Sequence, residues 1–342
     1  MRCYHPPRGY GKRRLMRNVR LTVLILALIP AAFLHAPKPA TSVAQTVQRV
    51  DLLPAIRAAG GLDELGPFEI VGAWRLTSQH KNFGNFSALV RDRAGMMIAL
   101  GDRGGIMRFS PPDQPGPWRT YIGKLLSGDR SQRSSAYDAE SAALDPASGR
   151  LLVGYEGGVA MFDYPADLGL PAPIPLPVLL QWPDNQGPEA MVRLADGRTI
   201  ILGEVYARWF DRRVHGGLLF PGKPRPFESP ARFEIEMPEG CRPSDLAQLP
   251  DGRVLVLGRT LSAQGFRTTI LAFDPAEIRA GNKIMPHLLA TISKPGIREN
   301  YEGMTTLRDP DGNLAVWLIS DSNQMAWAQR TLLLKLRLNA AN

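Results

Sequence analysis

The chain has 342 residues, of which 44% are hydrophobic and 21% are charged, a balance that excludes a disordered or fibrous protein. Its 33 glycines and 30 prolines disfavour a long helical bundle and favour a fold rich in strands and turns. The formal net charge is +9, but seven basic and no acidic residues lie at positions 1–20, so residues 21–342 carry a net charge of only +2. Because this charge is small and the sequence contains no nucleic-acid-binding motif, we expect no nucleic-acid partner.

Residues 1–45 are predicted to be a signal peptide with a linker of small residues. A basic stretch, Arg13–Arg20, precedes an apolar run of 14 residues, Leu21–Leu34. This run is shorter than the roughly 20 residues that span a bilayer, and it is typical of the core of an export signal. Cleavage after Ala44 fits the small residue at Ser42. We expect an exported protein, periplasmic or extracellular, which contacts the membrane only through this signal or through an uncleaved anchor.

Residues 46–66 are interpreted as a lead-in segment. Within it, Leu53–Ala59 fits a short helix, which Gly60 and Gly61 would end. The main domain is then expected to occupy residues 67–342.

Five segments of the main domain follow the same plan, which indicates a repeat fold. In each, a polar triplet opens a short apolar strand, a turn such as Asp196-Gly197 follows, and a second apolar strand ends on a polar residue. Asp-Gly turns between such strands are typical of β-hairpins. The triplets end at positions spaced by 53, 49, 56 and 57 residues, namely Ser87, Glu140, Glu189, Asp245 and Glu302.

Further apolar segments after each hairpin supply a third strand and, in most repeats, a fourth. Four antiparallel strands in about 50 residues are typical of one blade of a β-propeller. The last repeat has only three strands, whereas Phe68–Leu76 precedes the first repeat without a hairpin of its own. We expect this N-terminal strand to pair with the C-terminal blade and close the ring. The sequence predicts an all-β propeller with five blades, or six if the N-terminal stretch holds a degenerate blade.

Polar residues at the start of each first strand and at the end of each second strand should meet, because the two strands are antiparallel. The strand ends carry Asp102, Glu156, Glu204, Arg259 and Asp321, so eight of the ten positions are carboxylates. Carboxylates crowded at one mouth of a propeller channel repel each other, which raises their pKa values unless cations lie between them.

Two interpretations of these acids stay open. They could bind a divalent cation, since carboxylate oxygens suit Ca²⁺, our first expectation, or Mg²⁺. They could instead accept hydrogen bonds from the backbone of the next blade and so hold the ring together. The candidate metal ligands are Asp102, Glu140, Glu189, Glu204, Asp245 and Glu302.

Several motifs at these positions stand in a recognisable order. They are Gly101–Gly104, Asp138–Ser141, Asn185–Ala190, Pro243–Leu246, Asp251–Arg253, Asn300–Gly303, Ile319–Asn323 and Gln329–Leu333. From about Phe83 to Leu338 the chain resembles the secreted proteins that carry the esterase-like domain of phytase. It departs from that pattern at Ser141, where the family has glycine. The resemblance implies hydrolysis of phosphoric or carboxylic esters.

The leading hypothesis is therefore an exported hydrolase that acts on a small ester, with a divalent cation at the acidic end of the channel. The candidate catalytic residues, which would hold the cation or activate water, are Glu140, Glu189, Glu302 and Asp321. The candidate substrate-binding residues are Arg103, Arg259 and Asn323. The alternative is a non-catalytic propeller that binds a ligand or a protein in the cell envelope. The sequence gives no oligomeric state.

Overall fold

The computed structural model describes residues 42–60, 65–126, 138–156, 160–182, 187–208, 211–322 and 329–339. Residues 1–41 of the predicted signal segment 1–45 and the candidate residue Asn323 lie outside these ranges. Within the described ranges, no helix has the length and apolar character needed to cross a membrane.

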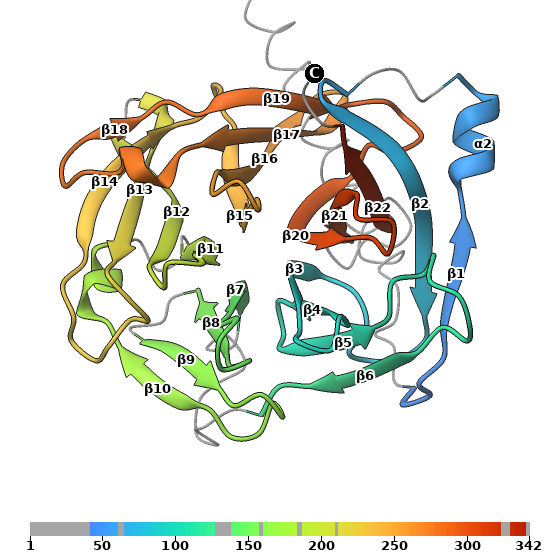
Figure 1. The fold of residues 1–342 in the computed structure, drawn as a ribbon, viewed down its shortest axis with the longest axis horizontal. Helices are drawn as coiled ribbons and strands as arrows, with labels where there is room; N and C mark the ends of the chain where they lie inside the picture. Colours follow the sequence, from blue (N-terminus) through green and yellow to red (C-terminus); the bar gives the residue numbers. More distant parts are fainter. Residues whose placement is uncertain are drawn as a thin grey trace, which may run out of the picture. The chain divides into compact units, whose positions relative to one another are not determined.

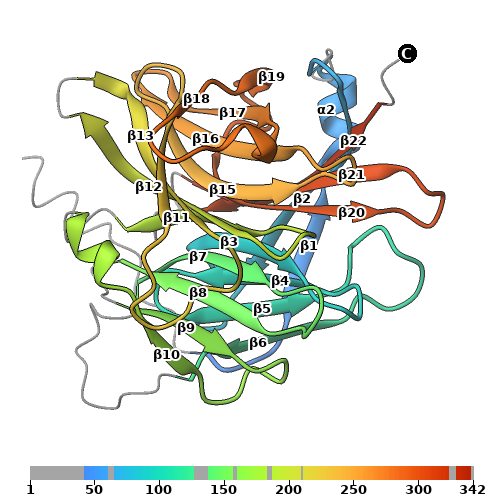
Figure 2. The same cartoon turned by 60° about the vertical axis from the view of Figure 1, so that its left-hand side comes forward.

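The described strands form five antiparallel blades of a β-propeller, as the repeats predict. In Figure 1 the blades stand around a common axis, and the inner strands β3, β7, β11, β15 and β20 lie nearest to it. Figure 2 shows one blade from the side, with β7 to β10 following one another in chain order. The fold class is therefore all-β, and the described residues hold five blades rather than six.

The first four blades each contain four antiparallel strands in chain order, and a short fifth strand from the last connection of blade 4 joins blade 3. Blade 1 consists of β3 (Phe86–Arg91), β4 (Met97–Gly101), β5 (Gly105–Phe109) and β6 (Thr120–Lys124). Blade 2 consists of β7 (Ala139–Leu144), β8 (Leu151–Tyr155), β9 (Ala160–Tyr164) and β10 (Ala172–Pro175). Blade 3 consists of β11 (Pro188–Arg193), β12 (Thr199–Arg208), β13 (Asp211–Phe220), β14 (Ala231–Glu236) and the short parallel strand β18 (Lys283–Ile284). Blade 4 consists of β15 (Arg242–Gln248), β16 (Val254–Ser262), β17 (Gly265–Phe273) and β19 (His287–Ile292).

Blade 5 combines the two ends of the described chain. Its C-terminal strands are β20 (Asn300–Arg308), β21 (Leu314–Asp321) and β22 (Thr331–Leu338), and its outer strands are β2 (Phe68–Ser78) and β1 (Val47–Asp51). Antiparallel pairing of Phe68 with Leu338 and of Leu76 with Thr331 confirms that the predicted N-terminal strand joins the C-terminal blade. The lead-in segment also supplies β1, which the sequence analysis did not predict.

The helices of the described residues are short. The predicted helix of the lead-in is present as α2 (Leu53–Ala58). Two 3-10 helices, η2 (Pro177–Gln181) and η3 (Pro275–Glu277), lie between strands.

Turn chemistry fixes the hairpins that connect the first and second strands. Between β15 and β16, the Asp251 side chain accepts a hydrogen bond from the backbone N–H of Arg253 at 3.0 Å. Gly252 has a φ of 95°, a conformation that glycine adopts without a Cβ clash. Such an Asp-Gly pair sets the register of the following strands.

Apolar side chains fill the spaces between blades and hold the inner strands in place. Between blades 3 and 4, for example, Ile235 and Val256 are fully buried in one cluster. In another cluster, Trp317 of β21 is fully buried and stacks on Trp74 of β2 with ring centroids 5.6 Å apart. Packing of this kind gives the polar ends of the inner strands fixed positions.

Candidate functional site

The five inner strands all contain a β-bulge at the same place. In blade 2, for example, Ala139 pairs with Tyr155 and Ser141 with Gly154, so that Glu140 is the extra residue. The extra residues of blades 1 to 5 are Ser87, Glu140, Glu189, Ser244 and Glu302. A bulge changes the direction of its side chain relative to the regular strand, and here it does so once per blade.

The predicted alignment of Asp245 with these residues is wrong by one position. In blade 4 the register shifts between Pro243 and Asp245, so Ser244 occupies the bulge. Asp245 is 1% exposed. Its carboxylate accepts backbone hydrogen bonds from Leu246 at 2.8 Å, from Met304 at 2.6 Å and from Leu89. Asp245 thus connects the inner strands of three blades, as expected if the acids accept hydrogen bonds from the backbone of neighbouring blades. We therefore leave Asp245 out of the cation site.

In four of the five blades the bulge residue has two polar neighbours, one just before the inner strand or at its first residue and one in the second strand or directly after it. In blade 3 the first of these two positions is Gly187. In blade 2 these neighbours are Asp138 and Glu156, and the N–H of Glu156 donates to the carbonyl of Asp138 at 2.8 Å. In blade 5 they are Asn300 and Asp321, which pair directly. We call the combined set the acidic mouth: Asp102, Asp138, Glu140, Glu156, Glu189, Glu204, Arg242, Arg259, Asn300, Glu302 and Asp321.

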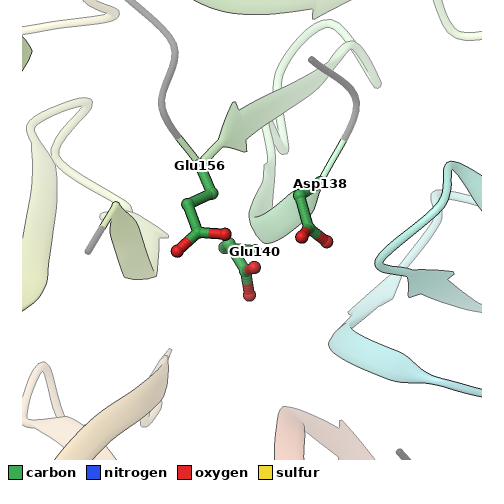
Figure 3. A group of neighbouring side chains, drawn as sticks. All are labelled: Asp138, Glu140 and Glu156. Carbon is green, nitrogen blue, oxygen red and sulfur yellow. The ribbon is translucent and has the colours of Figure 1, made fainter. Parts of the chain in front are cut away.

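Blade 2 brings three carboxylates together (Figure 3). One oxygen each of Asp138, Glu140 and Glu156 lies within 4.8 Å of the others, and the three side chains converge on one space. Asp138 and Glu156 also interact through a hydrogen bond between their carboxyl groups. Oxygen ligands of Ca²⁺ lie about 2.3–2.6 Å from the ion, and three oxygens with this spacing fit around one such ion.

The pKa values of the three blade 2 carboxyl groups are all raised, because the groups are buried close to other carboxylates. Burial raises the pKa of Asp138 to about 7, and the carboxylates of Asp102 and Glu156 act in the same direction. Burial also raises the pKa of Glu140 well above its ordinary value, with further increases from Glu189 and Asp138. The pKa of Glu156 is raised by burial as well. A cation among these groups would relieve the repulsion.

Blade 4 supplies the positive charge of the acidic mouth. Arg259 Nη1 lies 3.1 Å from Glu302 Oε1, and Nη2 lies 3.7 Å from Glu204 Oε1. Arg242 forms a second ion pair with Glu204 at 2.5 Å. Burial would lower the pKa of Arg259, but the carboxylates of Glu302 and Glu189 raise it above its ordinary value. Arg259 therefore acts as an internal counter-charge to the neighbouring blades.

Two further glutamates of the acidic mouth are buried. Glu189 and Glu302 are 6% and 7% exposed. Burial raises the pKa of Glu189 well above its ordinary value, and Glu204 adds to this while Arg259 opposes it. Burial likewise raises the pKa of Glu302, against the opposing effect of Arg259.

Two of the remaining predicted residues, Asp102 and Arg103, lie beside the carboxylates of blade 2. Asp102 accepts hydrogen bonds from Asn85 Nδ2 at 3.3 Å, and burial raises its pKa. Arg103 is exposed and close enough to Asp102 and Asp138 to lower the pKa of both carboxyl groups. Asn323 lies outside the described residues.

The sequence analysis did not select Asp138, Asn300 or Arg242 as site residues. Each of the three lies two residues before the bulge residue of its blade. Aligning the five repeats on the bulge would have placed them in one column with Asn85 and Gly187.

Comparison of the sequence with models of known protein families gives one match. A family model described as "Phytase-like: Esterase-like activity of phytase" matches residues 81–324. No curated protein sequence matches the chain.

Solved structures show similarity of fold alone. An endo-arabinase from Bacteroides thetaiotaomicron has a TM-score of 0.52 at 10% identity, over 76% of this chain and 96% of that one. An aldose sugar dehydrogenase from Streptomyces coelicolor has a TM-score of 0.43 at 12% identity, over 86% of this chain and all (100%) of that one. A hydrazine synthase from Kuenenia stuttgartiensis has a TM-score of 0.36 at 11% identity, over 70% of this chain, which spans only 57% of that chain.

Proposed function

This chain belongs to the phytase-like family, because the matching family model covers well over half of the sequence. On that premise we propose that the protein hydrolyses small phosphoric or carboxylic esters at the acidic mouth with the help of a divalent cation. The observation that carries the proposal is the convergence of three carboxylates in blade 2, Asp138, Glu140 and Glu156. Hard oxygen ligands of this kind suit Ca²⁺ and Mg²⁺. When bound, such a cation polarises an ester oxygen and lowers the pKa of a bound water.

Glu189 is our candidate for the general base. Its pKa is raised by burial, and it is close enough to Glu140 to raise the pKa of that carboxyl group. A carboxylate with a raised pKa takes a proton from water more readily at neutral pH than an ordinary glutamate does. The same proton can then pass to the leaving alcohol.

Arg103 is our candidate for binding the negative part of the ester. It is exposed at the edge of the acidic mouth beside Asp102 and Asp138. Guanidinium groups bind phosphate and carboxylate through paired hydrogen bonds. Arg259, in contrast, is engaged by Glu302 and Glu204, so we assign it to charge balance within the site.

The test uses the purified full chain, a phosphoric ester (p-nitrophenyl phosphate), phytate and a carboxylic ester (p-nitrophenyl butyrate). Hydrolysis of at least one ester should stop after chelation and return with Ca²⁺ or Mg²⁺. Glu140→Gln should lower kcat/KM by at least about 100-fold, whereas Asp251→Asn, in an exposed hairpin, should not change it. Turnover that persists in chelator would contradict the role of the cation. Cation binding without turnover of any ester would favour a binding module.

The proposal includes export, because residues 1–45 have the pattern of a signal peptide. Fractionation of the cells that make the protein should place it outside the cytoplasm. A protein that stays in the cytoplasmic fraction would contradict export without affecting the proposed chemistry.

A further inference from the structure

Blade 1 contains a hollow at the end opposite to the acidic mouth. Its inner strand β3 starts at the mouth and ends at Arg91, so the turn that follows lies at the far end of the blade. The hollow has a volume of about 270 Å³ and extends from this turn to β6, the outer strand of the blade (Figure 1). The residues that line it are Ala94, Met96, Arg108, Arg119, Thr120 and Tyr121.

The hollow continues the face of blade 1 that packs against blade 2. Ile98 pairs with Arg108, and Arg108 pairs with Tyr121, so the three side chains lie in one row across this face. Ile98 is buried in the apolar cluster between blades 1 and 2. Tyr121, in contrast, is 58% exposed. Blade 2 therefore covers the inner part of the face and leaves the outer part open to solvent.

The lining of the hollow is positively charged. The carboxylate of Asp92, in the turn, is fully engaged: Oδ1 accepts from the N–H groups of Ala94 at 2.8 Å and Met96 at 2.9 Å. Oδ2 pairs with Arg108, 2.7 Å from Nε and 2.5 Å from Nη2. Nη1 of Arg108 binds none of the described residues, and the guanidinium group of Arg119 forms no hydrogen bond or ion pair with them either. Both side chains therefore have N–H groups available to an anion.

Tyr121 gives the hollow an aromatic wall. Its ring lies against the backbone of Gly123, where a Cβ atom would come within 2.9 Å of the ring. Glycine inside a strand often marks such a close approach. The contact supports the ring on the edge strand while most of the residue stays exposed. An exposed aromatic ring beside guanidinium groups suits a ring compound that carries an anionic group.

We propose that this hollow binds a sugar that carries one phosphate or carboxylate group. Arg108 and Arg119 hold the anionic group through charge-assisted hydrogen bonds, and Tyr121 packs against the apolar C–H face of the sugar ring. The volume lies just below the roughly 300–1,000 Å³ of pockets that hold drug-sized ligands, so the ligand is a single ring. The site is separate from the acidic mouth and does not depend on the proposed ester hydrolysis.

The experiment is titration calorimetry on the full chain after its metals have been removed. The probes are glucose 6-phosphate, glucuronate, glucose and inorganic phosphate. Binding of a charged sugar without binding of glucose supports the site, and the charged sugar that binds more tightly identifies the anionic group as phosphate or carboxylate. Failure of both charged sugars to bind, or binding of glucose with equal affinity, would overturn the proposal.

Substitution of Arg119 tests where the anionic group lies. Arg119→Gln should weaken binding of the charged sugar at least about tenfold, because a charge-assisted pair of hydrogen bonds is lost. The control Arg253→Gln removes an exposed arginine of blade 4 and should leave the affinity unchanged. Glu140→Gln should also leave it unchanged. Unchanged affinity in Arg119→Gln, or lost affinity in Glu140→Gln, would overturn the site, the latter by placing the ligand in the acidic mouth.

Substitution of Tyr121 separates a built site from plain attraction of anions. Tyr121→Ala should weaken binding of the charged sugar at least about fivefold and leave the affinity for inorganic phosphate as it is, since phosphate has no ring. An equal Tm would show that the fold is intact, as expected for an exposed side chain. Equal binding of the charged sugar by Tyr121→Ala and the unmodified protein would overturn the role of the ring.

Discussion

Replacing Arg259 by methionine tests whether the acidic mouth depends on an internal counter-charge. The guanidinium lies 3.1 Å from Glu302 and 3.7 Å from Glu204, and the side chains are 25% exposed for Arg259 and 10% for each glutamate. Removing one partner of a buried ion pair costs about 3–5 kcal/mol. Partial exposure of the arginine favours the low end, so we expect a loss of about 3 kcal/mol in the free energy of unfolding at pH 7 without added cation.

The loss should grow with pH. Without Arg259, the pKa of Glu302 and that of Glu189 rise further above their values in the unfolded chain, because the guanidinium no longer opposes burial. Below the unfolded pKa both states hold the proton and the penalty is small. As the pH rises, only the unfolded state releases the proton, so the native state loses stability.

The measurement is urea unfolding of Arg259→Met at pH 5, 7 and 8 in the presence of chelator. The control is Arg253→Met, whose partner Asp251 forms an exposed ion pair with 49% exposure on each side, and which should cost less than about 1 kcal/mol. A loss in Arg259→Met that equals that of the control, or that does not change between pH 5 and pH 8, would refute the reasoning.

Two further predictions follow from the same geometry. Because the pKa of Asp138 is about 7, a cation must displace its proton at lower pH, so Ca²⁺ affinity measured by calorimetry should fall roughly fivefold from pH 7 to pH 6; equal affinity at the two values would argue against Asp138 as a ligand. Asp245→Ala should lower the free energy of unfolding by about 2–4 kcal/mol, since it leaves buried backbone N–H groups of Leu246 and Met304 without an acceptor. The same variant should bind as many Ca²⁺ ions as the unmodified protein, and the loss of an ion would return Asp245 to the site.

The sequence was sufficient to predict the blades because each repeats a local pattern. Asp-Gly turns such as Asp196-Gly197 separate apolar runs of fixed length, and hairpin formation depends mainly on these neighbours. The pairing of Phe68–Leu76 with the last blade followed from counting strands, since an unpaired strand remained at one end and a missing strand at the other.

The details of the site were harder to predict, because a bulge leaves no signal in the pattern of apolar residues. Pro243-Ser244-Asp245 matches the other triplets if its acid is taken as the anchor, yet the backbone places Ser244 at the bulge and turns Asp245 toward neighbouring strands. Arg242 and Asn300 received little weight for a related reason. Their importance comes from contacts between blades or across a strand pair, which sequence spacing does not show.

The pairing of β2 with β22 has a consequence for how the protein is made. β22, which completes blade 5, is translated about 260 residues after β2. One edge of β2 pairs with the preceding strand β1, but the other edge has to wait for β22 while nearly all of the propeller is synthesised. Contacts between such distant segments slow folding. Blade 5 can therefore be completed only after β22 has been made, whatever the order in which the other blades form.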